Sequence, residues 1–166
     1  MYLLVGLIFT GITLFLAKKG INNLWAIHVF TLVEYIILLV LLSRWTQYII
    51  AKKIFYTLII LFITLWIFSK FTFESLKLVD TWTSSISCTV LTISFAYMIL
   101  EMVSSIEILI IKDYRFWIIV GFLFYFSTSL ILYGLSNQIL GWGFESISDI
   151  ISKGLIIIGL LVAWKM

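Results

Sequence analysis

The stretch that decides the fold is AIHVFTLVEYIILLVLL, residues 26–42. Its strongly polar side chains are only those of His28, Thr31 and Glu34. The hydrocarbon core of a bilayer is roughly 30 Å thick and an α-helix rises about 1.5 Å per residue, so about 20 residues cross it. With its flanking residues, this run therefore predicts a transmembrane helix.

Five further apolar runs are long enough to suggest the same structure. They occupy residues 2–17, 54–68, 82–100, 116–135 and 147–164. Of the 166 residues, 63% are hydrophobic and 11% are charged, whereas a soluble domain carries about 25% charged residues. Six crossings would nearly use up the chain. We therefore predict an all-α, polytopic membrane helix bundle of about six transmembrane helices, forming one domain over residues 1–166.

Basic and aromatic residues mark the ends of these runs. The first and third runs have only about 16 residues each, so we expect nearby lysines to snorkel toward the headgroups. These lysines are Lys18, Lys19, Lys52, Lys53 and Lys70. Six of the seven tryptophans lie at or just beyond the end of a run, which is typical of an interfacial aromatic belt. The fourth run continues past Leu100 to Lys112, which predicts an amphipathic helical extension.

The basic residues also predict an orientation. With six crossings, six lysines and arginines lie on the side of the N-terminus and four lie on the other side. The positive-inside rule then favours a multi-pass protein of the cell membrane with both termini in the cytoplasm. Residues 1–17 lack the basic segment and the cleavage site of a secretory signal, so we expect them to be retained as a helix.

Ionisable residues inside the apolar runs are the first candidates for a functional site. A charge near the middle of the bilayer costs at least about 2.5 kcal/mol on insertion scales. Glu34 lies roughly 12 Å inside its helix, and His28 lies nearer to the interface. The two side chains either hydrogen-bond to helix backbones and hydroxyls, which is a structural role, or form a ligand or proton site.

Asp149 and Lys153 form a second candidate pair, because they are four residues apart with the acid first, the favourable order on a helix. Asp149 either caps this helix together with Ser146 or belongs to the same ligand or proton site. Lys153 either snorkels to the headgroups or meets Glu34, because the two lie roughly 9 Å and 12 Å from the same interface. We therefore expect His28, Glu34 and Lys153 to converge on one polar cluster.

Small side chains recur every four residues in the fourth run, at Ser84, Cys88, Thr92 and Ala96. Such a ridge lets another helix approach closely, so we expect it to be a helix-packing surface. The alternative is a polar lining for a solute path, because Ser85, Thr89 and Tyr97 lie on the adjacent ridge.

No catalytic or metal-binding pattern is present in the sequence. The single histidine and the single cysteine lie in different runs, and there is no GxSxG or HExxH motif. We therefore expect neither an enzyme, nor a metal site, nor a cofactor. The formal charge of +3 comes from residues at the ends of apolar runs, which suits lipid headgroups better than nucleic acid, so no nucleic-acid partner is expected.

One segment supports a family resemblance. The stretch GINNLWAIHVFTLVEY, residues 20–35, is followed much later by Phe116, Trp117 and Tyr125. This pattern resembles small uncharacterised bacterial multipass membrane proteins, some of them similar in layout to the membrane sensor regions of histidine kinases. The resemblance implies a helical bundle and no particular substrate.

The sequence leaves two classes of function open. The first is a sensor-like protein or an accessory subunit of a membrane complex, with the bilayer and a membrane protein or a second copy of the chain as partners. The alternative is a small oligomeric transporter or channel with a polar intramembrane site.

Overall fold

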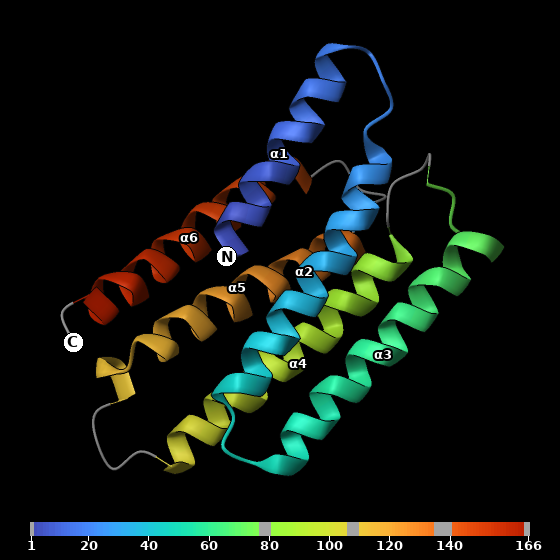
Figure 1. Cartoon of the computed structure of the whole chain (residues 1–166). Helices are drawn as coiled ribbons and strands as arrows, with labels where there is room; N and C mark the ends of the chain where they lie inside the picture. The colour runs from blue at the N-terminus through green and yellow to red at the C-terminus, as the bar shows by residue number, and fades with distance from the viewer. Residues whose placement is uncertain (1, 77–80, 106–109, 135–140, 165–166) are drawn as a thin grey trace. The chain divides into compact units, whose positions relative to one another are not determined.

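The structure of this chain is a computed structural model that describes residues 2–76, 81–105, 110–134 and 141–164 (Figure 1). Every regular element in these ranges is helical, and none is a strand. The elements are α1 (Tyr2–Lys18), α2 (Leu24–Trp45), α3 (Ile49–Thr72), α4 (Trp82–Ser105), the short 3₁₀ helix η1 (Ile110–Lys112), α5 (Tyr114–Gly134) and α6 (Gly141–Trp164). An α-helix therefore occupies each of the six predicted runs.

Four of these helices are long and apolar enough to cross a membrane. The qualifying segments are Leu24–Trp45, Ile49–Thr72, Trp82–Ser104 and Tyr114–Ile131. Two shorter apolar segments, Leu4–Lys18 and Ile150–Trp164, belong to α1 and α6. These lengths and compositions confirm the prediction of an all-helical membrane bundle, whereas the six crossings themselves stay a prediction.

Two boundaries differ from the sequence-based expectation. Helix α3 has 24 residues, not about 16, because it begins before Lys52 and continues past Lys70. It is therefore long enough to span the bilayer without thinning it. The amphipathic extension expected after α4 is not a continuous α-helix up to Lys112, because residues 110–112 form the 3₁₀ helix η1 and α5 begins at Tyr114.

The chain forms two compact units, residues 1–87 and residues 88–166, and α4 contributes residues to both. In the first unit, α1 turns back through Gly20, whose φ of 66° lies in the left-handed region that favours glycine. Helix α1 packs on α2 through Phe9 and Phe30, whose ring centroids are 5.4 Å apart. Tyr35 of α2 stacks on Phe62 of α3 at 4.0 Å. These aromatic contacts hold three helices of the first unit together.

The second unit is built around α5. Phe95 of α4 stacks on Phe122 and Phe126 of α5, with centroids 5.3 and 5.9 Å apart. Helices α5 and α6 run side by side (Figure 1) and approach closely at Gly121 and Gly159. A Cβ atom added to Gly121 would lie 3.0 Å from the carbonyl oxygen of Ser152. The contact between α5 and α6 therefore depends on residues without a side chain.

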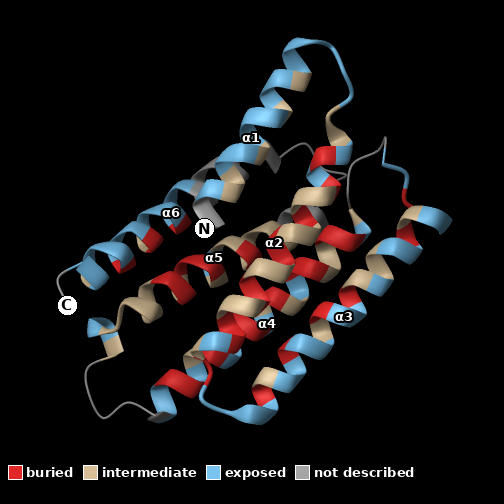
Figure 2. Ribbon diagram, in the orientation of Figure 1, coloured by how far each residue is buried: buried red, intermediate tan, exposed pale blue. Residues whose placement is uncertain are grey.

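Burial follows the pattern of a membrane bundle (Figure 2). Helices α1 and α6 are mostly exposed along their described lengths, and the exposed side chains there are mainly apolar. In a lipid solvent such side chains contact acyl chains, so their exposure needs no polar compensation. The polar side chains that are buried therefore become the main candidates for function.

Candidate functional site

The first unit brings four polar side chains together, which we call the polar cluster: His28, Lys70, Glu74 and Thr83. His28 lies in the second turn of α2, and Lys70 lies in the last turn of α3. Glu74 follows the end of α3, and Thr83 is the second residue of α4. The polar cluster therefore joins one end of each of three helices.

Lys70 is the centre of the polar cluster. Its Nζ atom lies 2.6 Å from Nδ1 of His28, 2.7 Å from Oε2 of Glu74 and 3.1 Å from Oγ1 of Thr83. An ammonium group has three N–H donors, and these three contacts match them one for one. Because an ammonium cannot accept, Nδ1 of His28 is the acceptor, and we infer that the ring proton is on Nε2.

Glu74 is surrounded just as completely. Its Oε1 atom accepts hydrogen bonds from the backbone N–H groups of Thr81, at 3.1 Å, and Trp82, at 3.0 Å. Its Oε2 atom accepts from Thr83 Oγ1 at 2.8 Å and from Lys70. The first backbone N–H groups of a helix have no partner inside it. The Glu74 carboxylate thus caps α4 from outside that helix, and its charge suits the positive end of the helix dipole.

The surroundings exclude water from the polar cluster. The side chains of Lys70 and Glu74 are 7% and 4% exposed, and His28 and Thr83 are fully buried. The indole of Trp66 donates a hydrogen bond to the His28 carbonyl oxygen at 3.1 Å, and its ring lies 5.4 Å from Lys70 Nζ. A buried, hydrogen-bonded ion pair of this kind is costly to break from one side, because the remaining charge loses its partner.

The chemistry open to the polar cluster is hydrogen bonding between a buried ammonium group, a carboxylate, a hydroxyl and an imidazole. His28 accepts from Lys70 only while Nδ1 carries no proton. Within the described residues, no group of three or more His, Cys, Asp or Glu side chains could hold a metal ion.

The structure places the sequence-predicted residues in different surroundings. His28 belongs to the polar cluster, and Glu34 is buried on the same helix. Lys153 is exposed on α6 in the second unit. The side chain of Asp149 lies outside the described residues. Because Glu34 and Lys153 belong to different units, their convergence with His28 stays a prediction.

The small-residue ridge of α4 changes its burial along the helix. Ser84 and Cys88 are buried, whereas Thr92 and Ala96 are half-buried. In the first unit, Ser84 Oγ lies 3.4 Å from the Thr31 hydroxyl of α2, which is a helix-to-helix polar contact. On the adjacent ridge, Thr89 and Tyr97 are exposed and Ser85 is half-buried. The Ser85 hydroxyl donates a hydrogen bond to the Thr81 carbonyl oxygen. Helix packing and a polar lining both stay predictions for this face.

Sequence reasoning missed Lys70, Glu74 and Thr83. It assigned Lys70 to snorkelling, and this was wrong, because the ammonium group is buried and paired. A signal was present: Lys70 and Glu74 are four residues apart at a helix end, and a threonine lies in the first turn of the next helix. That signal does not show that a histidine 42 residues earlier completes the group.

Comparison with protein-family models, with curated proteins and with solved structures finds no match to this chain.

Proposed function

We propose that this integral membrane protein is a sensor-like protein or an accessory subunit of a membrane complex. The observation that carries the proposal is the saturation of the polar cluster. All three donors of Lys70 and four acceptor positions of Glu74 are engaged by groups of the first unit. A group with no spare hydrogen-bonding capacity is suited to fixing helices, and less suited to exchanging a solute with water.

The site of a transporter or channel lines a water-filled path and must release what it binds. The charged side chains of the polar cluster are almost completely enclosed, which favours the sensor or subunit over the small oligomeric transporter. Residues 20–35 resemble small bacterial multipass membrane proteins, some of which are similar in layout to membrane sensor regions of histidine kinases, and this resemblance also favours the sensor-like role.

His28 is the proposed responsive member of the polar cluster. It faces Lys70 from α3, and Lys70 in turn faces Glu74, whose carboxylate caps α4. A ligand or partner that moves Nδ1 of His28 away from Lys70 would weaken the contacts at three helix ends at once. This coupling gives a small protein a way to report a change to a partner in the membrane.

Association with a partner tests the proposal. We expect the tagged, full-length chain, crosslinked in its native membranes, to recover one membrane protein, or a second copy of itself, in a fixed ratio. Lys70→Met should abolish this recovery, while Lys53→Met, a matched change of an exposed lysine on the same helix, should preserve it. Flux of protons or small ions in proteoliposomes that Lys70→Met abolishes would instead establish the transporter or channel.

The proposed topology has six crossings of a cell membrane, and both termini lie in the cytoplasm. Reporter fusions placed at each connection measure it directly. Termini on opposite faces would reject six crossings, and both termini outside would reject the orientation alone.

A further inference from the structure

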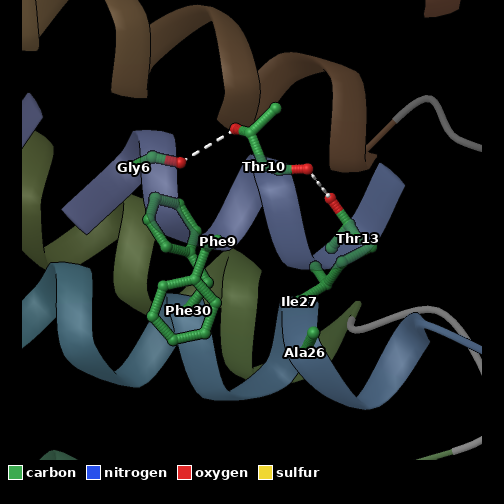
Figure 3. Close-up of a pocket in the computed structure, with 7 residues that line it drawn as sticks. All are labelled: Gly6, Phe9, Thr10, Thr13, Ala26, Ile27 and Phe30. Atoms are coloured by element: carbon green, nitrogen blue, oxygen red, sulfur yellow. Dashed lines mark hydrogen bonds between the residues drawn. The ribbon is translucent and has the colours of Figure 1, made fainter. Parts of the chain in front are cut away.

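A groove lies between α1 and α2 in the first unit (Figure 3). Its volume is about 150 Å³. Helix α1 lines it with Gly6, Phe9, Thr10 and Thr13, and α2 adds Ile27 and Phe30. The threonine hydroxyls donate to backbone carbonyl oxygens of their own helix, at 2.9 Å in both cases. The groove therefore presents carbon to its occupant, because its side-chain donors are already used.

The depth of the groove matches one leaflet of a bilayer. Thr13 precedes Lys18 by five residues and Gly6 precedes it by twelve. At about 1.5 Å per residue, the groove extends from roughly 7 Å to roughly 18 Å below the level of Lys18. This is the depth of an acyl chain whose headgroup lies at the lysine, since half of the hydrocarbon core is roughly 15 Å thick.

Two lysines, Lys18 and Lys19, lie at the outer end of the groove, and no acidic residue is near them in the sequence. Lys18 and Lys19 are exposed at the end of α1, and Lys19 Nζ lies 4.6 Å from the centroid of the Phe15 ring. The first acidic residue of the whole chain is Glu34, which lies in α2 beyond the groove-lining residues. The surface above the groove is thus complementary to an anionic group.

We propose that the α1–α2 groove binds one anionic phospholipid, with its headgroup on Lys18 and Lys19 and one acyl chain between Phe9 and Ile27. A helix from a second copy of the chain is about 10 Å wide with its side chains and does not fit a groove of about 150 Å³. An acyl chain is a single row of methylene groups and is therefore much narrower than a helix. This site is independent of the polar cluster and of its proposed role.

Two glycines of α1 provide a matched pair for the test. A Cβ atom added to Gly6 or to Gly11 would meet nothing within 4 Å, so both positions accept a larger side chain without a clash at Cβ. Gly6 lines the groove, whereas Gly11 does not. Gly6→Leu should therefore fill the groove, and Gly11→Leu should add the same side chain elsewhere on the helix.

Native mass spectrometry of the full-length protein with added phosphatidylglycerol or phosphatidylcholine measures the binding. We expect one phosphatidylglycerol to bind about tenfold more tightly than phosphatidylcholine, Gly6→Leu to abolish this binding and Gly11→Leu to retain it. The double variant Lys18→Gln, Lys19→Gln should bind both lipids equally. If Gly6→Leu does not fold, Thr10→Leu fills the same groove and allows the same binding measurement.

Four results would overturn the proposal. The first is equal binding of the two lipids by the unaltered chain. The second is equal phosphatidylglycerol binding by the Gly6→Leu and Gly11→Leu variants. The third is full displacement of the lipid by inorganic phosphate, which would show that Lys18 and Lys19 bind a free anion and not a lipid headgroup. The fourth is a dimer that the Gly6→Leu variant, but not the Gly11→Leu variant, dissociates. This result would show that the groove binds a second copy of the chain.

Discussion

The ammonium group of Lys70, near the end of α3, lies 2.6 Å from the Nδ1 atom of His28 in the second turn of α2. This contact ties together residues that are 42 positions apart in the chain. It makes His28 the link between α2 and the ion pair that caps α4.

Replacement of His28 by leucine should destabilise the protein by about 1–3 kcal/mol, because one N–H of the buried Lys70 ammonium then lacks an acceptor. His28→Gln should cost less, since its side-chain oxygen is also an acceptor. Thermal unfolding in detergent measures both. Equal losses for the two variants would show that the imidazole contributes packing and not a hydrogen bond.

The positions of the helices were predictable from the sequence, and the polar cluster was not. A run such as residues 26–42 indicates a helix by its length and composition alone. Lys70 looked like an interfacial anchor, because a lysine at the end of an apolar run usually snorkels. Its burial depends on α2 and α4 meeting the end of α3, and a single sequence does not show which helices are neighbours.

The contact between α5 and α6 illustrates the same limit. Gly121 and Gly159 are on different helices, so no spacing in the sequence indicates that both mark one close approach. Spacing rules detect small residues on one helix, such as a GxxxG pair.

Gly159→Ala should separate α5 from α6. The added methyl group would lie 2.8 Å from Cγ1 of Ile118 and 2.9 Å from the carbonyl oxygen of Tyr114. The backbone oxygen cannot easily move away, so we expect a loss of about 1–3 kcal/mol. Gly154→Ala is the control, because its methyl group would meet nothing within 4 Å and alanine favours a helix by about 1 kcal/mol. A Gly159→Ala variant as stable as the control would contradict the close approach.

Asp113 should make the second unit sensitive to acid. Its carboxylate accepts from the backbone N–H of Arg115 at 2.8 Å and pairs with the Arg115 guanidinium at 2.6 Å. Burial raises the pKa of the Asp113 carboxyl, but the hydrogen bonds and charge of Arg115 outweigh it, so the pKa is lowered from 3.8. The folded state therefore binds this proton less tightly than the unfolded state.

The stabilising effect of Asp113 is fully present above pH 3.8, the ordinary value of its carboxyl. It is lost as the pH falls through the lower pKa of the folded state. Asp113→Ala should remove this effect together with the cap of α5, at a cost of about 1 kcal/mol at neutral pH. Unfolding temperatures measured between pH 6 and pH 2.5 check both expectations. If the Asp113→Ala variant lost stability at low pH as the unaltered protein does, the acid sensitivity would come from other carboxyl groups.

Glu34 and Lys153 should be energetically coupled if they meet in the bilayer. Glu34→Gln and Lys153→Met should then each destabilise the protein, and the double variant should cost less than the sum of the two. The free energy of unfolding of all four proteins gives the coupling. Additive losses would leave Lys153 as a snorkelling anchor and Glu34 as an acid with other partners.

The central claim is that Lys70 and Glu74 form a buried ion pair that holds the ends of α2, α3 and α4 together. A double-mutant cycle on Lys70→Met and Glu74→Gln, measured as free energies of unfolding in detergent, tests it most directly. Each single variant should lose about 3–5 kcal/mol, because it leaves the other charge or its partners buried without compensation. The double variant should recover at least about 2 kcal/mol of the summed losses. An exposed ion pair would instead show single losses below about 1 kcal/mol that add in the double variant. That result would contradict the claim that the pair is buried and holds the helix ends together.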